Sequence, residues 1–218
     1  VGPDWLAQQA PHTVPQVPLR PHPAARWAWC DAHPAYALWQ HHRAGLALPD
    51  ALDWFGDVLR LRVRPARAVR YQAGQHVVLW LEAVARPYSL ASLPGEDDFL
   101  EFHIDCQRPG AFCDRARGLQ VGDQMHLGEF RGGALHYDPD WQERPLWLLA
   151  AGTGLAPLWG ILREALRLGH RGEIRVLHVA HDSTEHYLGE ALRALAAAHS
   201  QLQVELLKLQ AWVKETGQ

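Results

Sequence analysis

The residues best suited to chemistry are two glycines that follow an apolar run. Gly152 and Gly154 come after residues 146–151 and before a stretch with helical spacing, and glycines at such a turn let the backbone approach a ligand closely. Pro157 presets the first helical turn, and the free amides at a helix start favour a pyrophosphate. The spacing is not the three-glycine dinucleotide pattern, so an ordinary strand-to-helix loop is the alternative interpretation.

Other chemistries find less support in the residue types. A phosphate hydrolase or transferase is disfavoured because no Walker-type lysine follows Gly154 and no nucleophile elbow occurs. The three cysteines, Cys30, Cys106 and Cys113, lack the spacing of zinc or cluster loops, and the 14 histidines form no metalloprotease motif. We therefore expect no metal site.

Charge and hydropathy narrow the partners and the location. With 21 Lys and Arg against 24 Asp and Glu, the formal net charge is -3, which gives no electrostatic case for nucleic acid as the main partner. The longest apolar runs fall far short of the ~20 residues that a membrane span needs. The start shows no export signal, although Val1 indicates a trimmed start, so a cytoplasmic location is the default expectation.

Two kinds of periodicity describe the elements that must position the glycines. From residue 57 onward, apolar side chains such as Leu59, Leu61 and Val63 alternate with arginines, which predicts antiparallel strands in a barrel or sandwich. Further strands are expected at residues 76–81, 99–104 and 124–127. After Pro145, apolar strands at 146–151, 174–180 and 202–206 are separated by helical spacing at 158–166 and 187–195, which predicts a parallel sheet.

The composition adds an N-terminal arm to these two units. Eight of the 15 prolines but only two of the 18 glycines lie in residues 1–50, which favours an extended arm with one short helix at 34–44. We therefore expect three parts: the proline-rich arm at 1–50, the antiparallel unit at 51–142 and the parallel α/β unit at 143–218.

A second motif gives the glycine run its context. The run Arg86, Pro87, Tyr88, Ser89 resembles the flavin-binding signature of the ferredoxin-NADP reductase superfamily, and residues 152–157 resemble that family's pyridine-nucleotide loop. Between them, residues 101–113 resemble the strand and turn that meet the flavin pyrophosphate, and 119–123 resemble the hairpin that closes the barrel. The resemblance implies a six-stranded antiparallel FAD-binding barrel, followed by a shortened parallel α/β domain that binds NADPH or NADH.

The resemblance also implies a role for individual residues. Arg86 would bind the flavin phosphates as a fork, Tyr88 would pack on the ribityl chain or ring, and Ser89 would bond near the flavin N5 atom. Tyr88 and Ser89 are therefore the predicted catalytic residues. The other implied cofactor-binding residues are Pro87, His103, Ile104, Gly110, Ala111, Phe112, Cys113, Gly152, Thr153, Gly154, Ala156, Pro157 and Ser183.

The chain also departs from the family pattern. Asp105 stands where relatives usually carry a basic residue, and Cys113 stands where Ser or Thr commonly bonds a phosphate. Residues 181–184 do not decide between NADPH and NADH. The family's last strands and cysteine-glycine segment have no counterpart here, which indicates either a shortened chain or a naturally reduced member.

The implied activity is that of a flavin-dependent oxidoreductase. Nicotinamide C4 would pass a hydride to flavin N5, and electrons would continue to a partner acceptor such as an iron-sulfur or haem protein. The departures support an alternative, a degenerate flavin- or nucleotide-binding module without turnover. The acceptor and the oligomeric state stay open.

Overall fold

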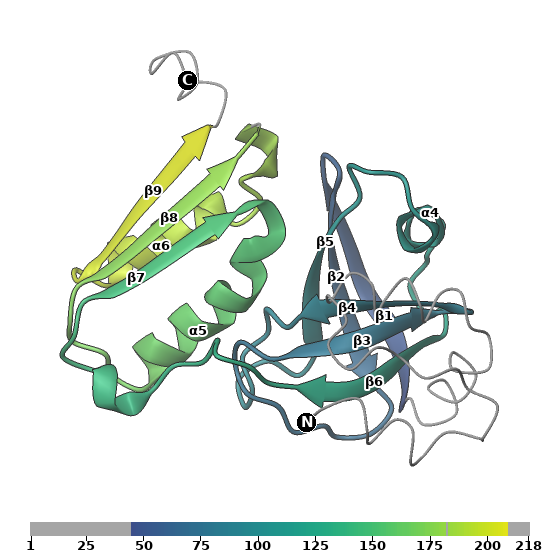
Figure 1. Cartoon of the computed structure of the whole chain (residues 1–218), viewed down its shortest axis with the longest axis horizontal. Coiled ribbons are helices and arrows are strands. Elements are labelled where there is room, and N and C mark those ends of the chain that lie inside the picture. The colour runs from purple at the N-terminus through teal and green to yellow at the C-terminus, as the bar shows by residue number, and fades with distance from the viewer. Residues whose placement is uncertain (1–44, 182, 209–218) are drawn as a thin grey trace, which may run out of the picture.

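The computed structural model describes residues 45–181 and 183–208, and it contains two sheets that lie beside each other (Figure 1). The first is a six-stranded antiparallel sheet and the second is a three-stranded parallel sheet. An antiparallel sheet followed along the chain by a parallel one confirms the predicted fold class. The predicted helix at 34–44 and most of the predicted arm lie outside the described residues.

The antiparallel sheet curves into a barrel whose strands are joined by short turns and loops. Its strands are β1 (Gly45–Phe55), β2 (Val58–Pro65), β3 (His76–Leu81), β4 (Val84–Ser89), β5 (Leu100–Asp105) and β6 (Met125–Arg131). Their spatial order is β4-β3-β6-β1-β2-β5. A short helix, α4 (Ala111–Arg117), follows β5.

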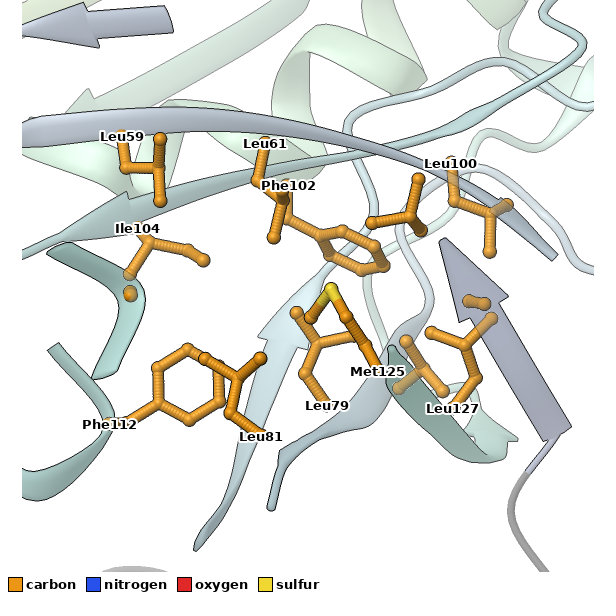
Figure 2. Close-up of a cluster of buried hydrophobic side chains, with 14 of the residues drawn as sticks. Leu59, Leu61, Leu79, Leu81, Leu100, Phe102, Ile104, Phe112, Met125 and Leu127 are labelled. Atoms are coloured by element: carbon orange, nitrogen blue, oxygen red, sulfur yellow. The ribbon is translucent and has the colours of Figure 1, made fainter. Parts of the chain in front are cut away.

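The barrel interior is built from the alternating apolar positions of these strands. Leu59, Leu61 and Val63 of β2 are fully buried, as the alternation predicts. They share the interior with Phe102 of β5 and with side chains of β3 and β6 (Figure 2). Phe112 of α4 packs into the same cluster, so this helix covers one end of the barrel.

Strand β1 (Gly45–Phe55) was not predicted by the sequence analysis. It starts at Gly45, so residues 45–50 belong to the sheet rather than to the proline-rich arm. The pairing register between β1 and β2 shifts between Pro49 and Ala51, and such an irregularity is where a strand accommodates a proline. Gly56, at a φ of 59°, then makes the tight turn into β2.

The barrel is open along one seam. Strands β4 and β5 stand at the two ends of the sheet order, and no ladder joins them in the part of the chain that the structure describes. Just past β4, the Ala91 amide donates to the Glu101 carbonyl at 2.8 Å and brings the two strands together. Within the described residues, the facing edges of β4 and β5 are therefore joined by no strand ladder.

The parallel sheet has its helices on one face. Its elements are β7 (Leu146–Ala151), α5 (Leu155–Arg167), β8 (Ile174–Ala180), α6 (Gly189–Ala198) and β9 (Leu202–Lys208), with short 3-10 turns η2 (Gly152–Gly154) and η3 (Ser183–Glu185) after β7 and β8. Both helices pack on the buried side chains of this sheet, such as Leu148 and Val176. On the opposite face Trp147 and Leu149 are 58% and 61% exposed.

Two helix boundaries test the sequence analysis. Gly169, with a φ of 77°, follows the end of α5, as expected for a left-handed helix stop. The placement of Tyr187 within the next helix is wrong, because α6 begins at Gly189. No helix within the described ranges is long and apolar enough to cross a membrane.

Helix α5 joins the two units. Its Gly160 lies against the loop that follows β4, where an added Cβ would sit 3.5 Å from the carbonyl oxygens of Ala91 and Ser92. One turn further on, Arg163 donates to both carboxylate oxygens of Asp97 in that loop, at 2.7 and 2.9 Å. The parallel sheet is therefore fixed against the barrel through direct contacts.

Candidate functional site

A cavity of about 340 Å³ opens between the two units. On the parallel sheet it is lined by the residues that end β7 and β8, and on the barrel by the start of β2 and the end of β5. Gly152 and Thr153 are part of its wall. This is the crevice outside the carboxyl ends of parallel strands, where ligands of open α/β sheets bind.

The cavity wall is predominantly acidic. Asp57, Asp105 and Glu185 contribute carboxylates, whereas Arg108 contributes one guanidinium. The Glu185 carboxylate also accepts from the backbone amide of His181 at 3.1 Å, which fixes it at the end of β8. A phosphate group that entered this cavity would therefore lie near carboxylates.

The glycine turn is anchored from the neighbouring strand. His178 of β8 is fully buried, and its Nε2 donates to the Gly152 carbonyl at 2.9 Å. Its Nδ1 lies 3.3 Å from Nδ1 of His186. Burial lowers the pKa of His178, so the ring is neutral and its Nδ1 accepts the proton of His186. A neutral ring thus holds the turn without adding charge.

Among residues 45–181 and 183–208, no side chain occupies the Cβ positions of the two glycines. A Cβ added at Gly152 or Gly154 would meet nothing within 4 Å. Gly152 has a φ of 51°, which disfavours any residue with a Cβ. The turn therefore leaves its backbone accessible to a ligand in the crevice.

The predicted flavin motif lies in β4, along the open seam. Tyr88 packs on Phe112 of α4, with ring centroids 5.0 Å apart, and burial raises the pKa of its phenol above the usual range. Arg86 is half-buried on the same strand and donates to the Ala85 carbonyl at 2.9 Å. The motif thus places a guanidinium and an aromatic ring on the strand that borders the seam between β4 and β5.

The residues along the seam fit a flavin nucleotide. Arg86 supplies a fork of donors for a phosphate, Tyr88 an aromatic surface and Ser89 a hydroxyl. Gly110 adds open space before α4, since a Cβ there would meet nothing within 4 Å. The backbone edges of β4 and β5 supply further donors and acceptors.

Two departures from the family pattern have a local explanation. Asp105 lines the cavity, and its carboxylate accepts from the Gln107 amide at 2.8 Å, which stabilises its own turn. Cys113 directs its Sγ to the Asp105 carbonyl at 3.5 Å. Because a thiol is a weak hydrogen-bond donor, Cys113 offers a phosphate less than Ser or Thr would. Burial and the neighbouring Cys113 raise the pKa of Cys106 to about 12, so its thiol is neutral.

Several predicted site residues do not present a side chain to the cavity or the seam. Ile104 is fully buried in the barrel core, and Ala156 and Pro157 are buried in the first turn of α5. His103 is buried as well and bonds to protein side chains, as described below. Ser183 lies in η3 next to the cavity wall. A ligand contact of these residues stays a prediction.

Sequence reasoning missed several of the cavity residues. Asp57 comes from the turn between β1 and β2, Val58 from the start of β2, and Gln107 and Arg108 from the loop after β5. Nothing in their spacing relates them to the glycine run. They reach the site only because α5 and η3 pack the parallel sheet against the barrel.

The chain matches two family models in succession. Residues 56–137 match the oxidoreductase FAD-binding domain, and residues 148–218 match the oxidoreductase NAD-binding domain. A similar solved structure is a cytochrome P450 reductase from Amycolatopsis, with a TM-score of 0.69 and 27% identity over 80% of this chain and 58% of that chain. A ferredoxin NADP+ reductase from Neisseria gonorrhoeae with bound FAD and NADP has the same fold, with a TM-score of 0.68 at 19% identity, covering 76% of this chain and 68% of that one.

Curated relatives agree with these matches. The reductase component of the naphthalene 1,2-dioxygenase system of Pseudomonas putida is 34% identical over 68% of this chain and 45% of its own. Reductase component 1 of terephthalate 1,2-dioxygenase from Comamonas is 30% identical over 67% of this chain and 42% of its own. The chain thus spans less than half the length of these relatives. With a barrel and a parallel sheet that both match in order, the chain belongs to the ferredoxin-NADP reductase superfamily.

Proposed function

We propose that this chain is an FAD-dependent NAD(P)H oxidoreductase. It takes a hydride from NADH or NADPH onto FAD and passes electrons to a partner. The observation that carries the proposal is the placement of two accessible binding surfaces, the open β4–β5 seam and the crevice at Gly152, on the two sides of one interface. The matches to FAD-binding and NAD-binding domains support it.

The residues of the chain divide the binding between the two units. Arg86 would hold the flavin phosphates, and Tyr88 and Ser89 would position the ring system. The turn at Gly152 would offer its amides to the pyrophosphate of the nicotinamide nucleotide. When bound, FAD supplies the redox chemistry, accepting a two-electron hydride and releasing electrons onward.

Orientation is the contribution of the protein to the reaction. A hydride passes only between atoms in near-contact, so the two surfaces must keep a fixed separation. The Arg163–Asp97 pair and the close approach of Gly160 to the barrel maintain that separation.

The electron acceptor and the location are part of this proposal. Relatives named as reductase components of dioxygenase systems support an iron-sulfur partner. Cys106 and Cys113 are free thiols, which supports a reducing, cytoplasmic compartment. We also propose a domain division near residue 142, with the barrel beginning at Gly45.

An anaerobic titration tests the proposal. The purified chain is loaded with FAD, and NADH or NADPH is added while the flavin absorbance is recorded. We expect bleaching of the oxidised flavin band by one nucleotide or both. A chain that retains FAD but is not bleached by either would be a binding module without turnover, and a chain that takes up no FAD would contradict the flavin site itself.

A further inference from the structure

A series of buried hydrogen bonds crosses the interface between the two units, and the function proposed above does not use it. Tyr187, in the loop between η3 and α6, is 7% exposed and its hydroxyl lies 3.0 Å from Nδ1 of His103 in β5. The two rings also meet edge to face, with centroids 4.7 Å apart. A residue of the parallel unit thus bonds to a residue of the barrel 84 positions away in the sequence.

The carboxylate of Glu101, which can only accept, fixes which atom donates in each of these hydrogen bonds. Nε2 of His103 lies 3.0 Å from Oε1 of Glu101, and a carboxylate only accepts, so Nε2 carries the proton. Burial lowers the pKa of His103, and the neutral ring keeps a lone pair on Nδ1. The Tyr187 hydroxyl therefore donates to His103.

Glu101, where this series of hydrogen bonds ends in the barrel, is itself held by a second partner. Arg62 of β2 donates to the second oxygen of Glu101 at 2.7 Å. Burial alone would raise the pKa of Glu101, but the hydrogen bonds from His103 and Arg62 lower it to about 2. The carboxylate is thus ionised and bonded on both oxygens, and it keeps the His103 ring in one orientation.

Beyond Tyr187, a ring contact rather than a hydrogen bond continues to the glycine turn. The Tyr187 ring stands nearly perpendicular to that of His178, with centroids 6.0 Å apart, and His178 is the residue that bonds the Gly152 carbonyl. Phe55, at the end of β1, packs on Tyr187 from the barrel, with centroids 6.2 Å apart. Tyr187 therefore connects β5 to the turn that we assign to the nicotinamide nucleotide.

We propose that Tyr187 is a positioning residue whose hydrogen bond to His103 sets the separation between the Gly152 turn and the barrel. The inference rests on the proposed function for its kinetic consequence but not for its structural one. Because donor and acceptor must approach within a few tenths of an ångström of contact, a small relaxation at this interface slows hydride transfer while both nucleotides still bind.

The test compares two tyrosines in the same chemical setting. Tyr137 is also 7% exposed and shares a buried hydrogen bond of 2.9 Å with a histidine, His170, but it lies in the core of the parallel unit, away from the cavity wall. The variants Tyr187→Phe and Tyr137→Phe each lose one hydroxyl and keep the ring. Any effect specific to Tyr187→Phe therefore reports the contact across the interface.

The first measurement needs no turnover. In the full chain without added flavin, hydrogen exchange of residues 152–154 and 100–105 is compared among wild type and both variants. We expect Tyr187→Phe to accelerate exchange in both segments about tenfold, and Tyr137→Phe to leave them unchanged. Equal exchange in the two variants would overturn the proposal, whatever the activity of the chain.

The second measurement separates binding from transfer. With FAD bound, Tyr187→Phe should slow flavin reduction at saturating NADH or NADPH by about tenfold or more, with the Kd values for FAD and for that nucleotide within twofold of wild type. A rise in the Kd alone would mean a binding role and contradict the positioning role. If wild type itself is not reduced, the proposed function fails, and the exchange measurement still decides the inference.

Discussion

Arg163 of α5 and Asp97 of the loop after β4 form a two-point ion pair that bridges the parallel unit and the barrel. Both side chains are largely shielded, at 22% and 13% exposed, and Asp97 also accepts from the Leu93 amide at 2.7 Å. The hydrogen bonds and charge of Asp97 raise the pKa of Arg163. Such a pair contributes far more than an exposed one.

Replacing Asp97 should therefore destabilise the folded chain. Asp97→Asn keeps the shape but removes the charge, and we expect the free energy of unfolding to fall by about 1–3 kcal/mol. Urea unfolding measures the change. The neighbouring Asp98→Asn is the control, because the Asp98 and Arg64 side chains are 71% and 51% exposed and their ion pair contributes little. Equal losses in the two variants would contradict the role of the bridge.

Arg86 is the residue that ties the flavin assignment to one side chain. Loss of a charge-assisted phosphate contact costs about 1.5–3 kcal/mol, so Arg86→Ala should weaken FAD affinity about 10- to 100-fold. Fluorescence titration of added FAD measures it. Arg67→Ala, on the exposed loop after β2, should bind FAD like wild type. A normal FAD affinity in Arg86→Ala would refute the phosphate assignment.

The acidic cavity favours NADH over NADPH. The extra phosphate of NADPH would enter a wall that carries Asp57, Asp105 and Glu185. Asp57 is already paired with Arg117 at 3.0 Å. The repulsion therefore comes mainly from Asp105 and Glu185, and it is about 1 kcal/mol for two like charges about 4 Å apart in water. We expect the chain to bind NADH at least tenfold more tightly than NADPH. Glu185→Gln should reduce this difference between the two Kd values. Glu205→Gln, on exposed β9, should leave it unchanged. Tighter binding of NADPH by wild type would contradict the electrostatic argument.

Stability should decrease in mild acid. Burial lowers the pKa of His103, His170 and His178 in the folded chain, whereas in the unfolded chain each titrates near its usual value of about 6.5. Below that pH the unfolded state binds more protons, so the stability that is complete above about pH 6.5 is lost as the pH falls toward the folded-state values.

We expect the free energy of unfolding to fall by about 1 kcal/mol per buried histidine when the pH is lowered from 7.5 to 5.5. Urea midpoints at the two pH values give the difference directly. Replacing the exposed His136 by Gln should not change it. A midpoint that stays constant over this interval would mean that these rings titrate in the folded chain as they do in the unfolded one.

Local periodicity was sufficient to predict most of the fold. The alternation at Leu59, Leu61 and Val63 gave a buried strand face, and the apolar runs at 146–151 and 174–180 coincide with β7 and β8. Strand β1 was not predicted, because Pro49 and the register shift beside it interrupt any regular pattern. The tendency of proline to end a ladder was outweighed by pairing with two neighbouring strands.

The interface residues could not be predicted for a different reason. Tyr187 has helical spacing with Ala191 and Leu195, which suggests a helix face, yet its partner His103 is far away in sequence. The same holds for Asp57 and Arg108 in the cavity wall. Contacts that depend on how two units pack have no signature in local sequence.

The open seam between β4 and β5 has a consequence for the flavin-free protein. Strand edges without a partner are templates for pairing with another polypeptide. A flavin lying along the seam would shield these edges, so loss of FAD should promote edge-to-edge aggregation. Purification in excess FAD should therefore keep the chain monodisperse, and light scattering during dialysis against flavin-free buffer would reveal the onset of association.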